Sequence, residues 1–185
     1  ALAFLECSWN LLTSIDVSNN ASLNDFRCMD NQLTILNVNN NTFLSIFDCR
    51  YNNLTSLDVS NNTALDWLVC GDNQLTSLDV NNNTALTFLY CPDNQLTSLD
   101  VSNNFNLISL ACQNNLLSTL DLRNGNNQNM ATNSNWGNNH VALTNNPNLI
   151  CVDVDDVSWA DTNWTVINGN IDPWTSFSIN CLTAF

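Results

Sequence analysis

Apolar residues recur along this chain with a period of 21 residues, in the pattern LxxLxCxxNxLTxLDVxNN. In the fifth copy, Leu86, Leu89 and Cys91 have the spacing of a short strand whose alternate side chains face inward. The segment that returns to the next strand has three more inward-facing apolar residues: Leu96, Leu99 and Val101. No stretch of about ten residues has a helical period, so we expect the return segments to be extended or tightly turned.

Six copies follow one another without an insertion, and each opens on a leucine: Leu2, Leu23, Leu44, Leu65, Leu86 and Leu107. A period of this length is typical of solenoids, in which each copy forms one coil that packs only on its neighbours. We predict three segments: six regular repeats over 1–127, an irregular coil and a last strand over 128–154, and a C-terminal cap over 155–185. Tryptophans in the last segment can cover the apolar end of the final coil.

The units resemble leucine-rich repeats over residues 2–122, and the 21-residue form with cysteine at the sixth position is similar to the repeats of internalin J-type bacterial surface proteins. It also resembles repeats in secreted proteins of Bacteroidetes. The resemblance implies a right-handed leucine-rich-repeat solenoid with a parallel β-sheet on one face and little or no α-helix. It further implies an adhesion or recognition role in a secreted or cell-surface protein, and not an enzyme.

Six cysteines share one repeat position: Cys7, Cys28, Cys49, Cys70, Cys91 and Cys112. Side chains stacked in register on strands about 4.8 Å apart point the same way, which disfavours the torsion of a disulfide. We therefore predict a ladder of reduced, buried thiols that packs the core. Cys151 and Cys181 stand outside this ladder, and we predict that a disulfide between them staples the end of the solenoid.

Two polar columns accompany the repeat. An asparagine amide recurs where the chain leaves each strand, and it can pair buried turn backbone: Asn10, Asn31, Asn52, Asn73, Asn94 and Asn115. An aspartate recurs after the return segment: Asp16, Asp58, Asp79, Asp100 and Asp121. Stacked carboxylates suit calcium, but the second copy has Asn37 here, which favours an acceptor oxygen for the following turn.

The copies differ most at the strand positions that alternate with the inward leucine and cysteine and therefore point outward. Five apolar residues there are expected to form one exposed patch: Ile46, Trp67, Val69, Phe88 and Tyr90. Four charged residues and a tyrosine lie beside it: Asp25, Arg27, Asp48, Arg50 and Tyr51. Glu6, Arg27 and Asp48 stack in one column and predict either a cross-strand ion ladder or a polar rim. We predict that the ten patch and neighbouring residues bind a ligand.

Composition narrows the choice of partners. The net charge is −14, with three basic residues and no lysine, which disfavours nucleic acid and anionic membranes. The chain has no run of about 18 apolar residues, so we predict no membrane insertion. The single histidine, His140, and the absence of a CxxC pair speak against a zinc site. We predict no cofactor and no metal, and a start within a repeat suggests a piece of a longer chain.

The leading hypothesis is a non-catalytic extracellular module that binds a protein or a polysaccharide on the strand face. A glycan-active enzyme would need two carboxyl groups, and Glu6 and Asp48 lie about 9.6 Å apart by strand spacing, but we expect Arg27 between them to hold both ionised. A structural spacer or an ice-binding solenoid is a further alternative. The ice-binding hypothesis rests on a column of small hydroxyls: Thr13, Thr34, Thr55, Thr76, Thr97 and Ser118.

Overall fold

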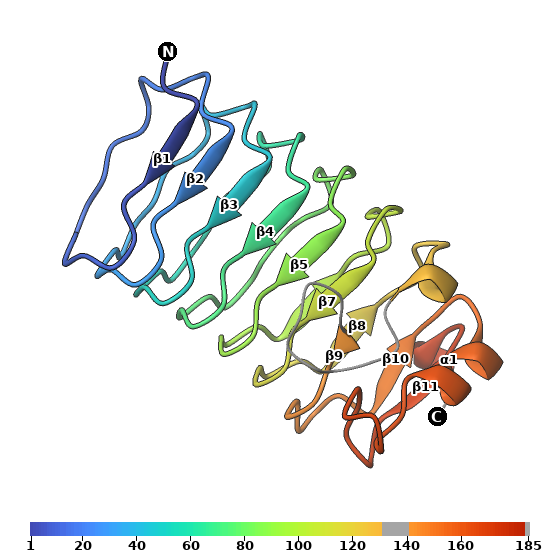
Figure 1. Cartoon of the computed structure of the whole chain (residues 1–185). Coiled ribbons are helices and arrows are strands. Elements are labelled where there is room, and N and C mark those ends of the chain that lie inside the picture. Colours follow the sequence, from blue (N-terminus) through green and yellow to red (C-terminus); the bar gives the residue numbers. More distant parts are fainter. Residues whose placement is uncertain (131–140, 184–185) are drawn as a thin grey trace.

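The computed structural model describes residues 1–130 and 141–183, and over these residues the chain is a parallel β-solenoid (Figure 1). Leu68 pairs with Leu89, which pairs with Leu110, so each coil repeats the register of the last. Seven short strands form a parallel sheet on one face, in the order β1 (Phe4–Glu6), β2 (Asp25–Arg27), β3 (Ile46–Asp48), β4 (Trp67–Val69), β5 (Phe88–Tyr90), β7 (Ser109–Ala111) and β9 (Val141–Ala142). The predicted parallel sheet is confirmed.

A second parallel sheet forms on the return path of the later coils. Its four strands run in the order β11 (Ser176–Ser178), β10 (Cys151–Asp153), β8 (Thr119–Asp121) and β6 (Ser98–Asp100). The earlier return segments follow the same extended course without assigned strands, as the lack of a helical period predicted. In β6, Leu99 is buried between two exposed neighbours, so the second sheet shares the core of the first.

The core between the two faces is a stack of leucine, valine and cysteine side chains from successive coils. Cys7 is half-buried, whereas the other five ladder cysteines are buried, and all six are free thiols. Burial raises the pKa of the Cys112 thiol to about 12 and raises those of Cys49, Cys70 and Cys91 well above their ordinary value. The prediction of reduced, buried thiols is therefore confirmed for the inner coils.

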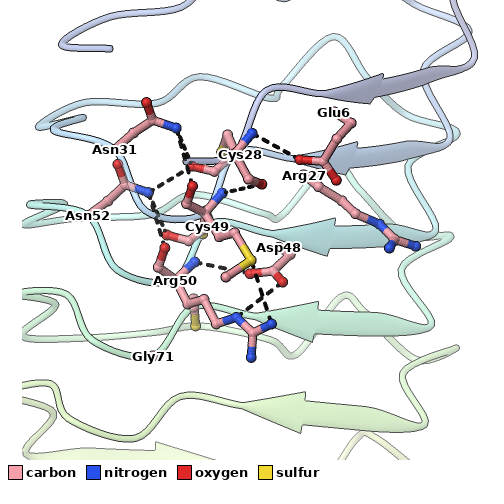
Figure 2. Close-up of polar contacts among 12 residues, drawn as sticks. Glu6, Arg27, Cys28, Asn31, Asp48, Cys49, Arg50, Asn52 and Gly71 are labelled. Carbon is pink, nitrogen blue, oxygen red and sulfur yellow. Dashed lines mark hydrogen bonds and ion pairs between the residues drawn. The ribbon is translucent and has the colours of Figure 1, made fainter. Parts of the chain in front are cut away.

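The predicted asparagine column ties each coil to the one before it. Nδ2 of Asn73 donates to the carbonyl oxygen of Cys70 in its own coil and to that of Cys49 in the preceding coil, at 3.2 and 3.1 Å. Oδ1 of Asn73 accepts from the backbone N of Leu54, at 3.0 Å. The amides of Asn31 and Asn52 repeat these bonds one coil apart (Figure 2). The expected pairing of turn backbone is confirmed.

The aspartate column closes the turn that follows the return segment. Oδ1 of Asp79 accepts from the backbone N of Asn81 at 3.0 Å, and Oδ1 of Asn37 accepts from Asn39 at the same distance. An amide therefore replaces the carboxylate without loss of the bond, as predicted for an acceptor position. Among the described residues, no group of three or more histidine, cysteine, aspartate or glutamate side chains is placed to hold a metal ion.

The C-terminal end is covered by α1 (Val157–Asn163), β11 and two short 3₁₀ helices, η1 (Asn127–Asn129) and η2 (Cys181–Thr183) (Figure 1). Trp164 is fully buried and packs edge-on against Trp159, with ring centroids 5.1 Å apart. Cys151 and Cys181 form a disulfide with Cα atoms 5.8 Å apart, which attaches η2 to β10. In the irregular coil, Met130, Val141 and Leu143 are buried, and Trp136 lies outside the described residues.

Candidate functional site

Each arginine of the strand face pairs with an aspartate two residues earlier in its own coil. Nε and Nη2 of Arg27 donate to the two carboxylate oxygens of Asp25 at 2.9 and 3.0 Å. Nε of Arg50 lies 3.3 Å from Oδ2 of Asp48 (Figure 2). Among the described residues no salt bridge joins Glu6, Arg27 and Asp48, so the expected ion ladder lacks direct cross-strand pairs, although the charge of Arg27 acts on both carboxyl groups. The physical reason is that residues i and i+2 of a strand share one face, which lets the planar arginine fork reach the nearest carboxylate.

Glu6 and Asp48 differ in their electrostatic environments. A hydrogen bond from Ser8 is the main cause that lowers the pKa of Glu6, and Arg27 adds to it. Burial raises the pKa of Asp48, although Arg50 and Arg27 act in the opposite direction. Arg27 thus favours the ionised form of both carboxyl groups, as expected, but at Asp48 desolvation outweighs the two arginines and the net pKa is raised. His140, the lone histidine, lies outside the described residues.

The apolar patch predicted to be exposed is largely buried. Val69, Phe88 and Tyr90 are only 4, 6 and 4% exposed, and they form a second apolar cluster with two small residues, Ala111 and Ala142. This cluster lies on the outer side of the strand sheet, apart from the core. The expectation that these residues present free surface to a ligand is wrong, although they do point away from the core.

Ring contacts are part of this packing. The Trp67 ring stacks on that of Phe88 with centroids 4.0 Å apart and packs against the second cluster. The Tyr90 ring lies against Gly71, where an added Cβ would come within 3.0 Å of Tyr90 Cε1 and 2.9 Å of Pro92 Cδ. Large rings on strands about 4.8 Å apart therefore cover one another, and the glycine lets Tyr90 lie flat.

Aromatic residues of β1 and of the turns that follow β1 and β3 are exposed on the strand side. Trp9 is 70% exposed, Phe4 is 53% exposed and Tyr51 is 44% exposed. Arg27 is exposed, whereas Ile46 and Arg50 are half-buried, and Nη2 of Arg50 also contacts the sulfur of Met29 at 3.6 Å (Figure 2). We define the N-terminal strand face as six residues: Phe4, Trp9, Arg27, Ile46, Arg50 and Tyr51.

The backbone singles out Trp9 and Tyr51. Each coil has one residue in the left-handed region just after its strand, with φ between 52° and 59°: Trp9, Asp30, Tyr51, Asp72, Asp93, Asn114 and Asn145. Aspartate and asparagine tolerate this conformation, whereas a bulky aromatic residue is an outlier there. Sequence reasoning missed Trp9 and Phe4 as candidates. The signal for Trp9 was its position in a column otherwise filled mainly by aspartate and asparagine.

The described helices are short. The longest helix in residues 1–130 and 141–183 is α1, with seven residues, and no described helix is long and apolar enough to cross a bilayer. The side chains of the predicted hydroxyl column, from Thr13 to Ser118, are exposed on the return path.

Comparison with solved structures identifies the fold. The functional domain of InlJ from Listeria monocytogenes, which includes a cysteine ladder, matches with a TM-score of 0.67 and 28% identity over 95% of this chain and 38% of that one. The internalin InlF of the same species has a TM-score of 0.63 and 23% identity, over 95% of this chain and 47% of its own. A leucine-rich-repeat protein of Leptospira interrogans has a TM-score of 0.63 and 21% identity, over 96 and 48%.

This chain thus spans less than half the length of each of these three proteins. No protein-family model matches the sequence, and a search of curated protein sequences finds no match. The parallel sheet, the extended return path and the structural neighbours agree, so the chain has the leucine-rich-repeat solenoid fold with a cysteine ladder.

Proposed function

We propose that this protein is a non-catalytic recognition module of a secreted or cell-surface bacterial protein, and that its N-terminal strand face binds a protein ligand. The observation that carries the proposal is the pair of exposed aromatic residues, Trp9 and Tyr51, held in left-handed backbone. The similarity to the functional domain of InlJ supports a recognition role.

The backbone conformation of Trp9 and Tyr51 works against stability. A non-glycine residue in the left-handed region costs about 1–2 kcal/mol, and asparagine is among the residues that tolerate it best. The later coils have Asn114 and Asn145 at the same position. Two exposed aromatic rings at strained positions therefore contribute little to the fold, and strained residues of this kind cluster at binding sites.

The composition of the face fits a protein partner. Tryptophan, tyrosine and arginine dominate the energetics of protein interfaces, and they are usually surrounded by polar groups that exclude water. Arg27 and Arg50 bring two positive charges to the strand face, each beside its own aspartate. An acidic group of the partner can compete for these guanidinium groups. Val69, Phe88, Tyr90 and Asp48 then act as a packed support, because they are buried.

A polysaccharide is the second candidate ligand, because the exposed Trp9 ring can stack on a sugar and Arg27 can pair with a carboxylate or sulfate. The two candidates are separated by binding measurements on a glycan array that includes acidic polysaccharides and on a panel of purified extracellular-matrix proteins.

The decisive variants are Trp9→Asn and Tyr51→Asn. Each places the residue of the later coils in the same left-handed turn, so we expect an unchanged or higher melting temperature together with at least tenfold weaker binding to the ligand that the wild type selects. Asp30→Asn is the matched control, since Asp30 lies between them in the same column. Binding that survives both aromatic substitutions would show that the ligand docks elsewhere.

A further inference from the structure

The loop that follows α1 closes the edge of the first sheet through one asparagine. Asn170 is fully buried, and its Nδ2 donates to the carbonyl oxygen of Val141 in β9 at 2.8 Å. Its own carbonyl oxygen accepts from the backbone N of Leu143, also at 2.8 Å. β9 is the last strand in the order of this sheet and pairs with β7. Asn170 therefore takes the place of a further coil at this edge.

The loop is a tight turn with an Asn-Gly step at its tip. The backbone N of Gly169 donates to the carbonyl oxygen of Val166, and that of Asn170 donates to the carbonyl oxygen of Thr165, each at 3.0 Å. Gly169 has a φ of 73°, which glycine adopts without strain. The side chain of Asn168 is exposed. The tip thus projects into solvent, whereas Asn170 at its base is buried.

An Asn-Gly step can lose the side-chain amide spontaneously, because glycine has no side chain to block the approach of its backbone N. This N attacks Cγ of the asparagine, a Cγ–N bond forms, and the Cγ–Nδ2 bond breaks. The proton of the attacking N leaves with Nδ2 as ammonia, and a cyclic imide remains. Water then opens the ring at one of its two carbonyl carbons and leaves aspartate or isoaspartate. In isoaspartate the backbone runs through Cγ and is one carbon longer.

The chain has two Asn-Gly steps, and the first is protected by its bonds. Asn124 is only 2% exposed. Its Nδ2 donates to the carbonyl oxygen of Asn104 at 3.2 Å, and its Oδ1 accepts from the backbone N of Asn126 at 2.9 Å. Rotation of this amide toward the N of Gly125 would break both bonds and leave buried groups unpaired, which is costly.

The second step, Asn168-Gly169, is placed differently. The side chain of Asn168 is exposed, so water can replace any bond that the amide gives up. The backbone N of Gly169 must leave the carbonyl oxygen of Val166, and a turn at the tip of an exposed loop opens locally at little cost. The folded structure therefore separates two steps that the sequence alone does not distinguish.

We propose that Asn168 is a site of spontaneous deamidation in the folded protein, and that the isoaspartate product loosens the hold of Asn170 on β9. Oδ1 of Asn170 accepts from the backbone N of Thr165 at 3.1 Å, so the loop is closed at both ends of the modified step. An extra backbone carbon between these two residues displaces Asn170 from Val141 and Leu143. This site lies at the C-terminal end and is independent of ligand binding at the N-terminal strand face.

The first test measures the reaction. The folded 185-residue protein is incubated at pH 8 and 37 °C, and peptide mass spectrometry with electron-transfer fragmentation follows aspartate and isoaspartate at both Asn-Gly steps. We expect Asn168 to react at least tenfold faster than Asn124 in the folded protein, and the two rates to become similar in concentrated urea, where the protecting bonds of Asn124 are lost. Equal rates in the folded protein, or a faster reaction at Asn124, overturn the proposal.

The second test measures the effect on β9. The isoaspartate form is separated by ion exchange, and amide hydrogen exchange at Leu143 is followed by NMR. The matched control is Asn168→Asp, which has the same charge and a backbone of normal length. We expect at least fivefold faster exchange in the isoaspartate form than in wild type, and no change in Asn168→Asp. Equal exchange in all three forms, or equal acceleration in both altered forms, contradicts the proposed effect of loop length.

Discussion

Individual aspartates of this chain respond to pH in opposite directions. Burial raises the pKa of Asp48, whereas hydrogen bonds from Ser18 and Ser60 lower the pKa values of Asp16 and Asp58. A carboxyl group with a raised folded-state pKa loses stabilising free energy as pH rises, and one with a lowered pKa gains it. The same residue type is therefore unfavourable at one position and favourable at another.

Asp48→Asn tests this difference. Because the folded-state pKa of Asp48 lies above its unfolded value, its contribution to stability is fully present below about pH 4 and is lost as pH rises through the folded-state pKa. We expect the free energy of unfolding of Asp48→Asn to increase relative to that of wild type from pH 3 to pH 7, so that the variant becomes relatively more stable. Urea denaturation at each pH measures it.

Asp16→Asn is the control with the opposite sign, because its lowered pKa stabilises the folded protein above the unfolded pKa. Relative to wild type, the free energy of unfolding of this variant should decrease over the same pH range. A common trend in the two variants would mean that the net charge, and not the local environment, sets the pH dependence.

Among the repeated elements, buried asparagine amides add side-chain bonds between coils to the strand pairing and the shared core. Asn73→Ala would leave the carbonyl oxygens of Cys49 and Cys70 and the backbone N of Leu54 without this partner in a buried site. We expect a loss of about 3 kcal/mol in the free energy of unfolding, measured by chemical denaturation. The matched variant Asn10→Ala affects an exposed amide that pairs only within its own coil. We expect its free energy of unfolding to fall by less than about 1 kcal/mol. Similar losses in the two variants would argue against a role of the asparagine column in joining the coils.

How far the sequence predicts these elements depends on the kind of contact that forms them. Strands, return segments and the asparagine bonds follow from one 21-residue unit, so they could be predicted from it. Exposure on the strand face could not, because it is set by contacts between coils, such as those of Phe88 with Trp67 and of Tyr90 with Gly71. The partners of the arginines could not be predicted for a related reason. Each arginine pairs with the nearest carboxylate, and the column pattern in the sequence does not give that distance.

The whole molecule has two unlike ends. Its C-terminal end is covered by α1 and β11 around the buried Trp164, whereas β1 pairs only with β2, and Leu2 and Leu11 are exposed (Figure 1). Since a solenoid is stabilised by contacts between neighbouring coils, a coil with one neighbour opens most readily.

Hydrogen exchange followed by mass spectrometry should reveal this gradient. We expect peptides from residues 1–21 to exchange faster than peptides from residues 65–105, because the latter coils have neighbours on both sides and higher opening free energies. Peptides that contain β10 serve as the internal control for a covered end, and their protection should match that of the central coils. Uniform exchange along the chain would instead indicate one cooperative unit.

The asparagine bonds have a consequence for how such a chain can evolve. Each internal coil offers the same carbonyl groups to the next coil and takes the same ones from the last, so loss of residues 72–92 would join CG to DNQLTSLDV and recreate a native junction. A duplicated or deleted gene segment of one unit length therefore yields a longer or shorter protein with every joint matched. Outward-facing residues can change independently in each coil. The length of the solenoid and its ligand preference can therefore diverge separately.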